Sequence, residues 1–213
     1  MFKKVMAATL ISSALLAGAN AQQANDSVYK KKHQDWTVEC FAAPNNKKEC
    51  QMFHQTTMAA PADEKLAKDK QRQVPILRTS ITLFDKTPVM VFAAPLDVQL
   101  SEGLQIRLNS NDDKGKIYIT VKGQDEAGKE KDIDTDIAQI NFERCTNFGC
   151  IAALPMDVDV KGKLLEQFQK GNNVFVNFTF DSNAPKNSPL HIKATAPLKG
   201  FSAAYTDLLE QSK

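Results

Sequence analysis

Residues 36–53, WTVECFAAPNNKKECQMF, decide the fold of this chain. Trp36 and Val38 alternate with polar residues, which is typical of a half-buried strand. The segment 50–57 supplies a second strand, and residues 43–46 between the two carry turn-forming Pro and Asn. The stretch therefore predicts an antiparallel hairpin with one face in the core.

The N-terminal segment has the regions of a secretory signal peptide in their usual order. Two lysines form a positive head, an apolar run covers residues 5–17, and small residues lead to the expected cut between Ala21 and Gln22. Residues 1–21 are therefore predicted to be removed. As a membrane anchor, about 13 apolar residues would span roughly 20 Å, against a bilayer core of about 30 Å. No later stretch reaches the roughly 18 apolar residues of a transmembrane span, so none is predicted.

Four cysteines belong to the mature chain: Cys40, Cys50, Cys145 and Cys150. An even number in an exported protein predicts disulfides, and three pairings are possible in principle. The sequence favours Cys40 with Cys50 and Cys145 with Cys150, because each pair flanks a turn. A Cys40–Cys145 bond would contradict this interpretation. The alternative of a four-cysteine zinc site lacks the usual knuckle spacing in the first pair, and zinc needs reduced thiols.

The rest of the mature chain is dominated by short strand patterns. Strands are predicted at 76–84, 89–94, 96–100, 104–108, 117–121, 137–145, 150–156, 174–180 and 190–196. Helical spacing of apolar residues predicts two short helices at 163–170 and 201–209, and polar loops are expected at 58–73 and 123–132. Many short strands with few helices predict a mainly β fold, a sandwich or barrel-like domain. It would be a single domain over 35–213, preceded by a flexible lead-in at 22–34.

Charge narrows the choice of partner. The net charge is +2, and Lys3 and Lys4 in the predicted signal peptide account for it, so the mature chain is neutral. A neutral chain has no bulk attraction to phosphates, which argues against a nucleic-acid partner.

Several motifs recur in one order along the chain. They are Trp36-x-Val38-x-Cys40 with Cys50, Pro95-Leu96-Asp97-Val98 before the strand Gly103 to Leu108, Phe142-x-Arg144-Cys145, Gly149-Cys150-Ile151-Ala152, a helix ending at Gly171, and the closing run Leu198 to Ala204. Over residues 36–209 this ordered set resembles the invasion-associated locus B (IalB) family of alphaproteobacterial exported proteins. The resemblance implies an immunoglobulin-like β-sandwich, a periplasmic or outer-membrane location and a link to host-cell invasion. The chain departs from the family at two loops, 58–73 and 123–132, which are longer here than in the family.

No residue pattern indicates catalysis, a cofactor or a metal. The general bases available near neutral pH are His33, His54 and His191. We expect His33 in the flexible lead-in and the other two in strands as structural residues. No nucleophile-elbow or phosphate-loop pattern is present, and disulfide-bonded cysteines are not nucleophiles. The acidic string at 132–136 followed by Glu143 resembles a calcium loop, but Ile137 stands where the loop needs Gly.

Three functions follow in order of preference. The first is an exported, non-enzymatic envelope or surface protein that contributes to host-cell invasion by binding an envelope or host protein through loops or sheet edges. The second is a periplasmic envelope-stress or assembly factor whose effect on invasion is indirect. The third, a hydrolase, would require a pocket that holds a histidine beside a carboxylate and a nucleophile.

Overall fold

A computed structural model gives the fold. It describes residues 27–44, 47–59, 73–109, 119–124, 129–135, 138–147, 149–156, 164–180 and 190–213. The strands in these residues are β1 (Ser27–His33), β2 (Trp36–Ala42), β3 (Lys48–Ala59), β4 (Gln73–Phe84), β5 (Thr87–Ala94), β6 (Leu104–Asn109), β7 (Ile119–Gln124), β8 (Glu130–Thr135), β9 (Ala138–Ile140), β10 (Arg144–Thr146), β11 (Gly149–Pro155), β12 (Asn173–Phe180) and β13 (Leu190–Pro197). The helices are α1 (Leu164–Lys170) and α2 (Phe201–Gln211). The predicted signal peptide, its cleavage site and most of the loop at 58–73 lie outside the described residues.

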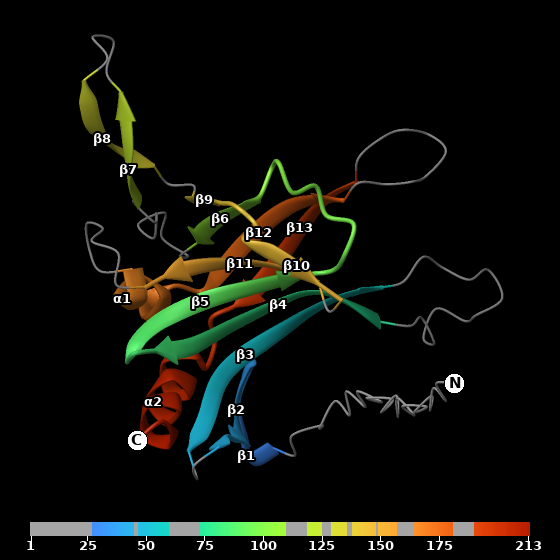
Figure 1. The fold of residues 1–213 in the computed structure, drawn as a ribbon, viewed down its shortest axis with the longest axis vertical. Coiled ribbons are helices and arrows are strands. Elements are labelled where there is room, and N and C mark those ends of the chain that lie inside the picture. The colour runs from blue at the N-terminus through green and yellow to red at the C-terminus, as the bar shows by residue number, and fades with distance from the viewer. Residues whose placement is uncertain are drawn as a thin grey trace, which may run out of the picture.

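The strands form two antiparallel layers (Figure 1). The large sheet has the order β1-β2-β3-β4-β5-β11-β10 and the small sheet the order β13-β12-β6-β9. A separate hairpin of β7 and β8 projects from the sandwich. Every strand pair in both sheets is antiparallel, so one face of each strand can be buried while the other meets water. The predicted mainly β sandwich is confirmed.

The core lies between the facing sides of the two sheets. Alternate residues of the large sheet point inward, with Trp36, Val38, Met52, Met90 and Phe92 fully buried. The small sheet contributes inward residues in the same period-2 pattern, among them Leu104, Ile106, Val174, Val176 and Ala194. This alternation on both sheets is the pattern from which the strands were predicted.

Helix α2 packs on β2 and β3, which the narrower small sheet does not cover in full (Figure 1). The Phe201 ring meets Trp36 edge-on, with centroids 5.1 Å apart, and Trp36 Nε1 donates a hydrogen bond to the Pro197 carbonyl at 2.8 Å. Phe201 and Leu208 are fully buried, and each such side chain contributes roughly 1.5–3 kcal/mol. The C-terminal helix is therefore part of the core and not an appendage.

The lead-in prediction was wrong for much of its length. Residues 22–34 were expected to be flexible, yet 27–33 form β1, the edge strand of the large sheet. The segment lacks an apolar period because most of its side chains are exposed and it is held by polar contacts to α2.

Three other boundaries also differ from the predictions. The segment 96–100 forms turns with a single bridge, Val98 to Phe180. The charged loop expected at 123–132 is partly strand, because β8 begins at Glu130. The strand expected at 137–145 is divided between the sheets, with β9 in the small one and β10 in the large one.

Candidate functional site

A row of polar side chains crosses the outward face of the small sheet. The strand register places Gln139 opposite Gln105, Gln105 opposite Asn177, and Asn177 opposite Lys193. Neighbouring strands lie about 4.8 Å apart, so these four side chains follow one another in a line across the sheet. We call this line of three amides and one ammonium group the amide row.

A hydrogen-bonded cluster flanks the amide row, two residues further along β12 and β13. Thr179 Oγ1 donates to Glu102 Oε2 at 2.6 Å and lies 3.0 Å from His191 Nδ1. Together with the amide row these residues line a pocket of about 530 Å³. Small-molecule sites typically enclose roughly 300–1,000 Å³, so the pocket is large enough to hold a ligand.

Gly103 allows the loop that carries Glu102 to approach this close. Its φ is +63°, and a Cβ at this position would lie 2.4 Å from the Ile140 carbonyl oxygen. Only glycine fits such a conformation beside another backbone segment. The sequence therefore fixes one wall of the pocket with a single residue.

The cluster has the residue types of a hydrolase but not their order. In a catalytic triad the imidazole lies between the acid and the hydroxyl, and takes the hydroxyl proton. Here the Thr179 hydroxyl lies between Glu102 and His191 and gives its one proton to the carboxylate. The His191 Nδ1 must then donate to the hydroxyl oxygen. Thr179 is also only 3% exposed. This arrangement holds polar groups in place and is suited to binding.

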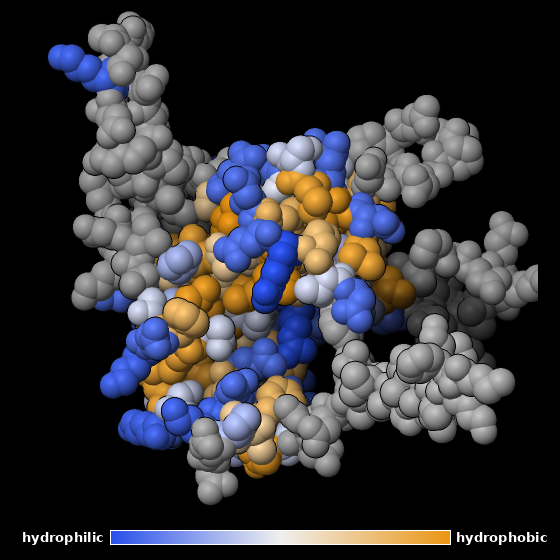
Figure 2. Space-filling model, viewed as in Figure 1, coloured by the Kyte–Doolittle hydropathy of each residue, from blue (hydrophilic) through white to orange (hydrophobic). Residues whose placement is uncertain are grey.

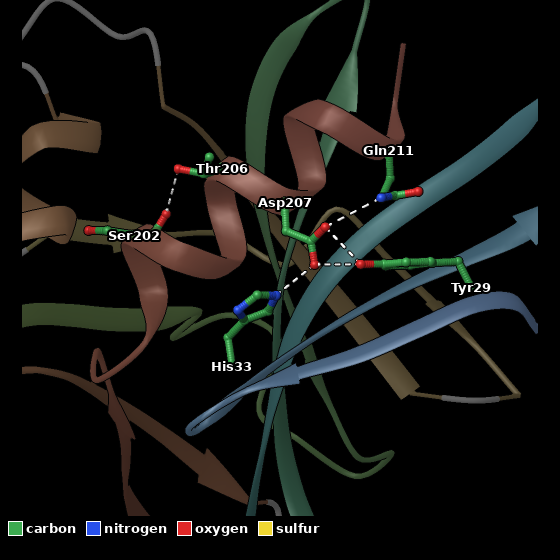
Figure 3. A network of polar contacts seen from close by, with 6 residues as sticks. All are labelled: Tyr29, His33, Ser202, Thr206, Asp207 and Gln211. Carbon is green, nitrogen blue, oxygen red and sulfur yellow. Dashed lines mark hydrogen bonds and ion pairs between the residues drawn. The ribbon is translucent and has the colours of Figure 1, made fainter.

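A second polar cluster joins the two ends of the described chain (Figure 3). His33 Nε2 lies 2.6 Å from Asp207 Oδ2, and the Tyr29 hydroxyl donates to both carboxylate oxygens at 2.8 and 2.9 Å. Gln211 Nε2 adds a longer contact of 3.4 Å to Oδ1. We call Tyr29, His33 and Asp207 the clasp, because they tie β1 to α2.

The clasp shifts the titration of two of its members. Burial alone would raise the pKa of Asp207, but hydrogen bonds from His33, Tyr29 and Gln211 outweigh it, and the pKa falls below the usual 3.8. The charge of Lys31 acts in the same direction. Burial, followed by the hydrogen bond to Asp207, raises the pKa of Tyr29 above 10.0. The carboxylate is therefore ionised and the phenol protonated at neutral pH.

An apolar surface covers part of the outward face of the large sheet. Strands β5 and β11 pair Val89 with Pro155, Val91 with Ala153, and Ala93 with Ile151, and none of these residues is fully buried. Apolar residues are visible between charged ones in the region of these strands (Figure 2). We call the three pairs the apolar ladder. An outward sheet face usually carries polar residues, so this strip is a candidate contact surface.

Both predicted disulfides are formed. Cys40 pairs with Cys50 across β2 and β3, and Cys145 pairs with Cys150 across β10 and β11. The described residues contain no free cysteine.

The histidines are divided among three places. His33 belongs to the clasp, and the expectation of a flexible His33 is therefore wrong. His54 Nδ1 lies 2.8 Å from the Asp35 carbonyl oxygen, and its ring stands beside Trp36. His191 lies in its predicted strand and lines the pocket. Sequence reasoning did not find Glu102, Thr179 or Asp207, because nothing local marks their partners.

The described parts of the chain show neither a cluster of metal ligands nor a membrane-spanning helix. No group of three or more His, Cys, Asp or Glu side chains is placed to hold a metal ion in the described ranges. Of the calcium-like string, Asp132 and Asp134 fall within β8, while residues 136 and 137 lie outside those ranges. Neither α1 nor α2 has the length and apolar character needed to cross a bilayer.

Sheet order, helix packing and bond pairing define the class of the protein as a β-sandwich with two local disulfides and a C-terminal helix in its core. The model of the Invasion associated locus B (IalB) protein family matches residues 126–209. This is the family that the ordered motifs of the chain resemble.

A solved structure has the same fold. It is the crystal structure of invasion associated protein b from Bartonella henselae, with a TM-score of 0.52 and 16% identity. The match covers 85% of this chain and 96% of that one. A comparison with curated proteins gives no match.

Proposed function

We propose that this chain is an exported, non-enzymatic envelope or surface protein that contributes to host-cell invasion by binding a protein partner. The family match over residues 126–209 supports the general assignment, and the similar Bartonella protein is named for its association with invasion. Two disulfides are in keeping with export, since such bonds persist in oxidising compartments.

The apolar ladder carries the proposal of a protein partner. Its three cross-strand pairs expose apolar side chains to solvent, and β5 is hydrogen-bonded to a neighbouring strand on each side. Interface cores are depleted of charge and formed by well-packed apolar groups, and a flat ladder can supply such a core. A partner with a complementary apolar face would cover Val91 and Ala153 at its centre.

A site-specific crosslinking experiment tests this surface. A photo-reactive amino acid replaces Val91 in the full chain, and crosslinking is done on intact bacteria in contact with host cells. The matched control carries the same group at Thr195, an exposed position on the small sheet. We expect one envelope or host protein to be crosslinked from Val91 and not from Thr195.

A charge substitution links the contact to the phenotype. Val91→Lys should leave folding intact, abolish the crosslinked partner and reduce host-cell entry, whereas Thr195→Lys should do neither. Unchanged entry and unchanged partner capture by a folded Val91→Lys protein would refute the proposal. Protease treatment of intact cells then distinguishes a surface protein, which is cleaved, from a periplasmic factor, which is protected.

A further inference from the structure

We propose that the pocket on the small sheet binds a neutral saccharide. This site lies on a different sheet from the apolar ladder, so the inference does not depend on the protein partner proposed above. It rests on the types of polar group in the pocket, their spacing, and the charges that surround them.

The amide row has the hydrogen-bonding capacity that sugar hydroxyls require. Each side-chain amide of Gln105, Asn177 and Gln139 offers both donors and an acceptor. A hydroxyl group also donates and accepts, so neighbouring hydroxyls on one ring can each meet a matching amide. Gln139 Nε2 donates to the Glu102 backbone carbonyl at 3.0 Å, which orients that amide before a ligand arrives.

The cluster that flanks the amide row is already ordered. Glu102 and His191 are both held by Thr179, so their orientation is set in the absence of ligand. Polar groups that are ordered in advance lose less conformational freedom on binding. A saccharide that reaches this cluster meets a fixed carboxylate, a strong acceptor for hydroxyl protons.

The charges in the pocket favour a neutral ligand over an anion. The lining contains one carboxylate, Glu102, and one ammonium group, Lys193. A phosphate attracted by Lys193 would also be repelled by Glu102, and no second cation lines the pocket among the described residues.

An aromatic ring borders the amide row. Phe175 lies two residues before Asn177 on β12, so it points to the same outward face, and it is only half-buried. In the sheet it stands between Thr195 and Arg107. A flat aromatic surface beside hydrogen-bonding groups can cover the apolar C–H side of a sugar ring.

Titration of the intact mature protein with defined sugars tests the proposal. Chitotriose represents amino sugars of the bacterial wall type, and N-acetyllactosamine represents a host glycan terminus. Inorganic phosphate serves as the anion probe. Calorimetry and ligand-observed NMR should detect millimolar or tighter binding of at least one sugar and none of phosphate, and the preferred sugar identifies the source.

Paired amide substitutions locate the bound sugar. Gln105→Ala with Asn177→Ala should weaken binding at least tenfold while the circular dichroism spectrum and the melting temperature stay unchanged. The matched control, Gln51→Ala with Gln55→Ala, removes two amides from β3 in the large sheet and should bind like the parent. The proposal is overturned if neither sugar binds the folded protein, if only phosphate binds, or if the pocket double variant binds as tightly as the parent.

Discussion

The two edges of the large sheet each lie next to a cross-strand disulfide, but their surroundings differ. Beside β1, Cys40 and Cys50 are 0% and 8% exposed and lie under α2, where Cys50 Sγ is 3.6 Å from the Gln211 carbonyl oxygen. At the opposite edge, Cys145 is exposed, and so are the other residues of the three-residue strand β10. The first disulfide therefore lies wholly in the core, whereas the second joins the exposed Cys145 to Cys150, which is 3% exposed.

The difference shows what holds each edge. Strand β1 has the ladder to β2, the clasp to Asp207, and a hydrogen bond from Asp35 N to the Lys199 carbonyl at 3.4 Å just after it. Strand β10 has one neighbour, β11, and the covalent bond to it. We infer that tertiary packing secures the β1 edge, whereas the disulfide has the larger relative share in securing the β10 edge.

The largest expected effect comes from closing the space between β1 and α2. Gly200 has a φ of +85°, and a Cβ there would lie 2.1 Å from the His33 carbonyl oxygen. In Gly200→Ala the left-handed backbone conformation costs about 1–2 kcal/mol, and the clash also separates β1 from α2. Together they should lower the free energy of unfolding by about 5 kcal/mol. Urea unfolding measures this loss, with Lys199→Ala as the exposed neighbouring control. A loss below about 1 kcal/mol would mean that β1 does not depend on α2.

Removing each disulfide in turn tests the comparison directly. The bonds close chain segments with sequence separations of 10 and 5 residues. Loop entropy alone then predicts stabilisation by about 2.7 and about 2.1 kcal/mol, a difference of only about 0.6 kcal/mol. Because the first bond is buried under α2, Cys40→Ala with Cys50→Ala should cost about 1.5 kcal/mol more than Cys145→Ala with Cys150→Ala. Equal losses in urea unfolding would show that packing around the two bonds does not matter.

How far the sequence predicts this fold depends on the distance between interacting residues. Both disulfides join cysteines across short turns, and the strand at 104–108 is evident from the alternation of its own residues. The disulfides and this strand were therefore predicted correctly. Strand β1 was missed because Tyr29 and His33 find Asp207 more than 170 residues away, and polar residues without an apolar period resemble a flexible segment.

The pocket was missed for a related reason. Asn177 and His191 were each predicted in a strand. The order in which the strands β6, β9, β12 and β13 pair cannot, however, be inferred from local sequence. The register of these strands brings Gln139, Gln105, Asn177 and Lys193 into one line. Glu102 joins them through Gly103, whose role depends on Ile140 in another strand.

Acid should weaken the β1 edge through Asp207. The folded-state pKa of Asp207 is depressed, so its ion pair and hydrogen bonds stabilise the fold above about pH 4, and this stability is lost as pH falls through the folded-state pKa. Asp207→Asn should cost about 2 kcal/mol at pH 7 and much less once the pH lies below the folded-state pKa of Asp207. Urea unfolding of both proteins across this range measures the convergence. Parallel curves would show that the clasp does not contribute through its charge.

Alkali should act on the same edge through Tyr29. Its pKa is raised, so the neutral phenol stabilises the fold below pH 10.0, and this contribution is lost as pH rises through the folded-state pKa. Tyr29→Phe should remove the share of the alkaline loss that Tyr29 causes and leave the share of buried Tyr205, whose pKa is also raised. It should also raise the pKa of Asp207, because the carboxylate loses one of its hydrogen bonds. A parent protein with no decline between about pH 9 and 11 would contradict this part of the prediction.

The smallest effect is expected on the outward side of β1. Lys30 Nζ lies 2.9 Å from Glu39 Oε1, but the Lys30 side chain is 60% exposed. Exposed ion pairs are screened by water and salt and contribute about 0–1 kcal/mol, so Lys30→Ala should destabilise by less than 1 kcal/mol. Glu39 also lies near Arg78: burial lowers the pKa of this arginine, and the negative charge of Glu39 offsets only part of that effect. Urea unfolding at low and high salt measures the cost. If Lys30→Ala costs as much stability as Asp207→Asn, β1 is secured by its outward face and not by α2. The difference between the two sheet edges would then be due to charge on the sheet surface.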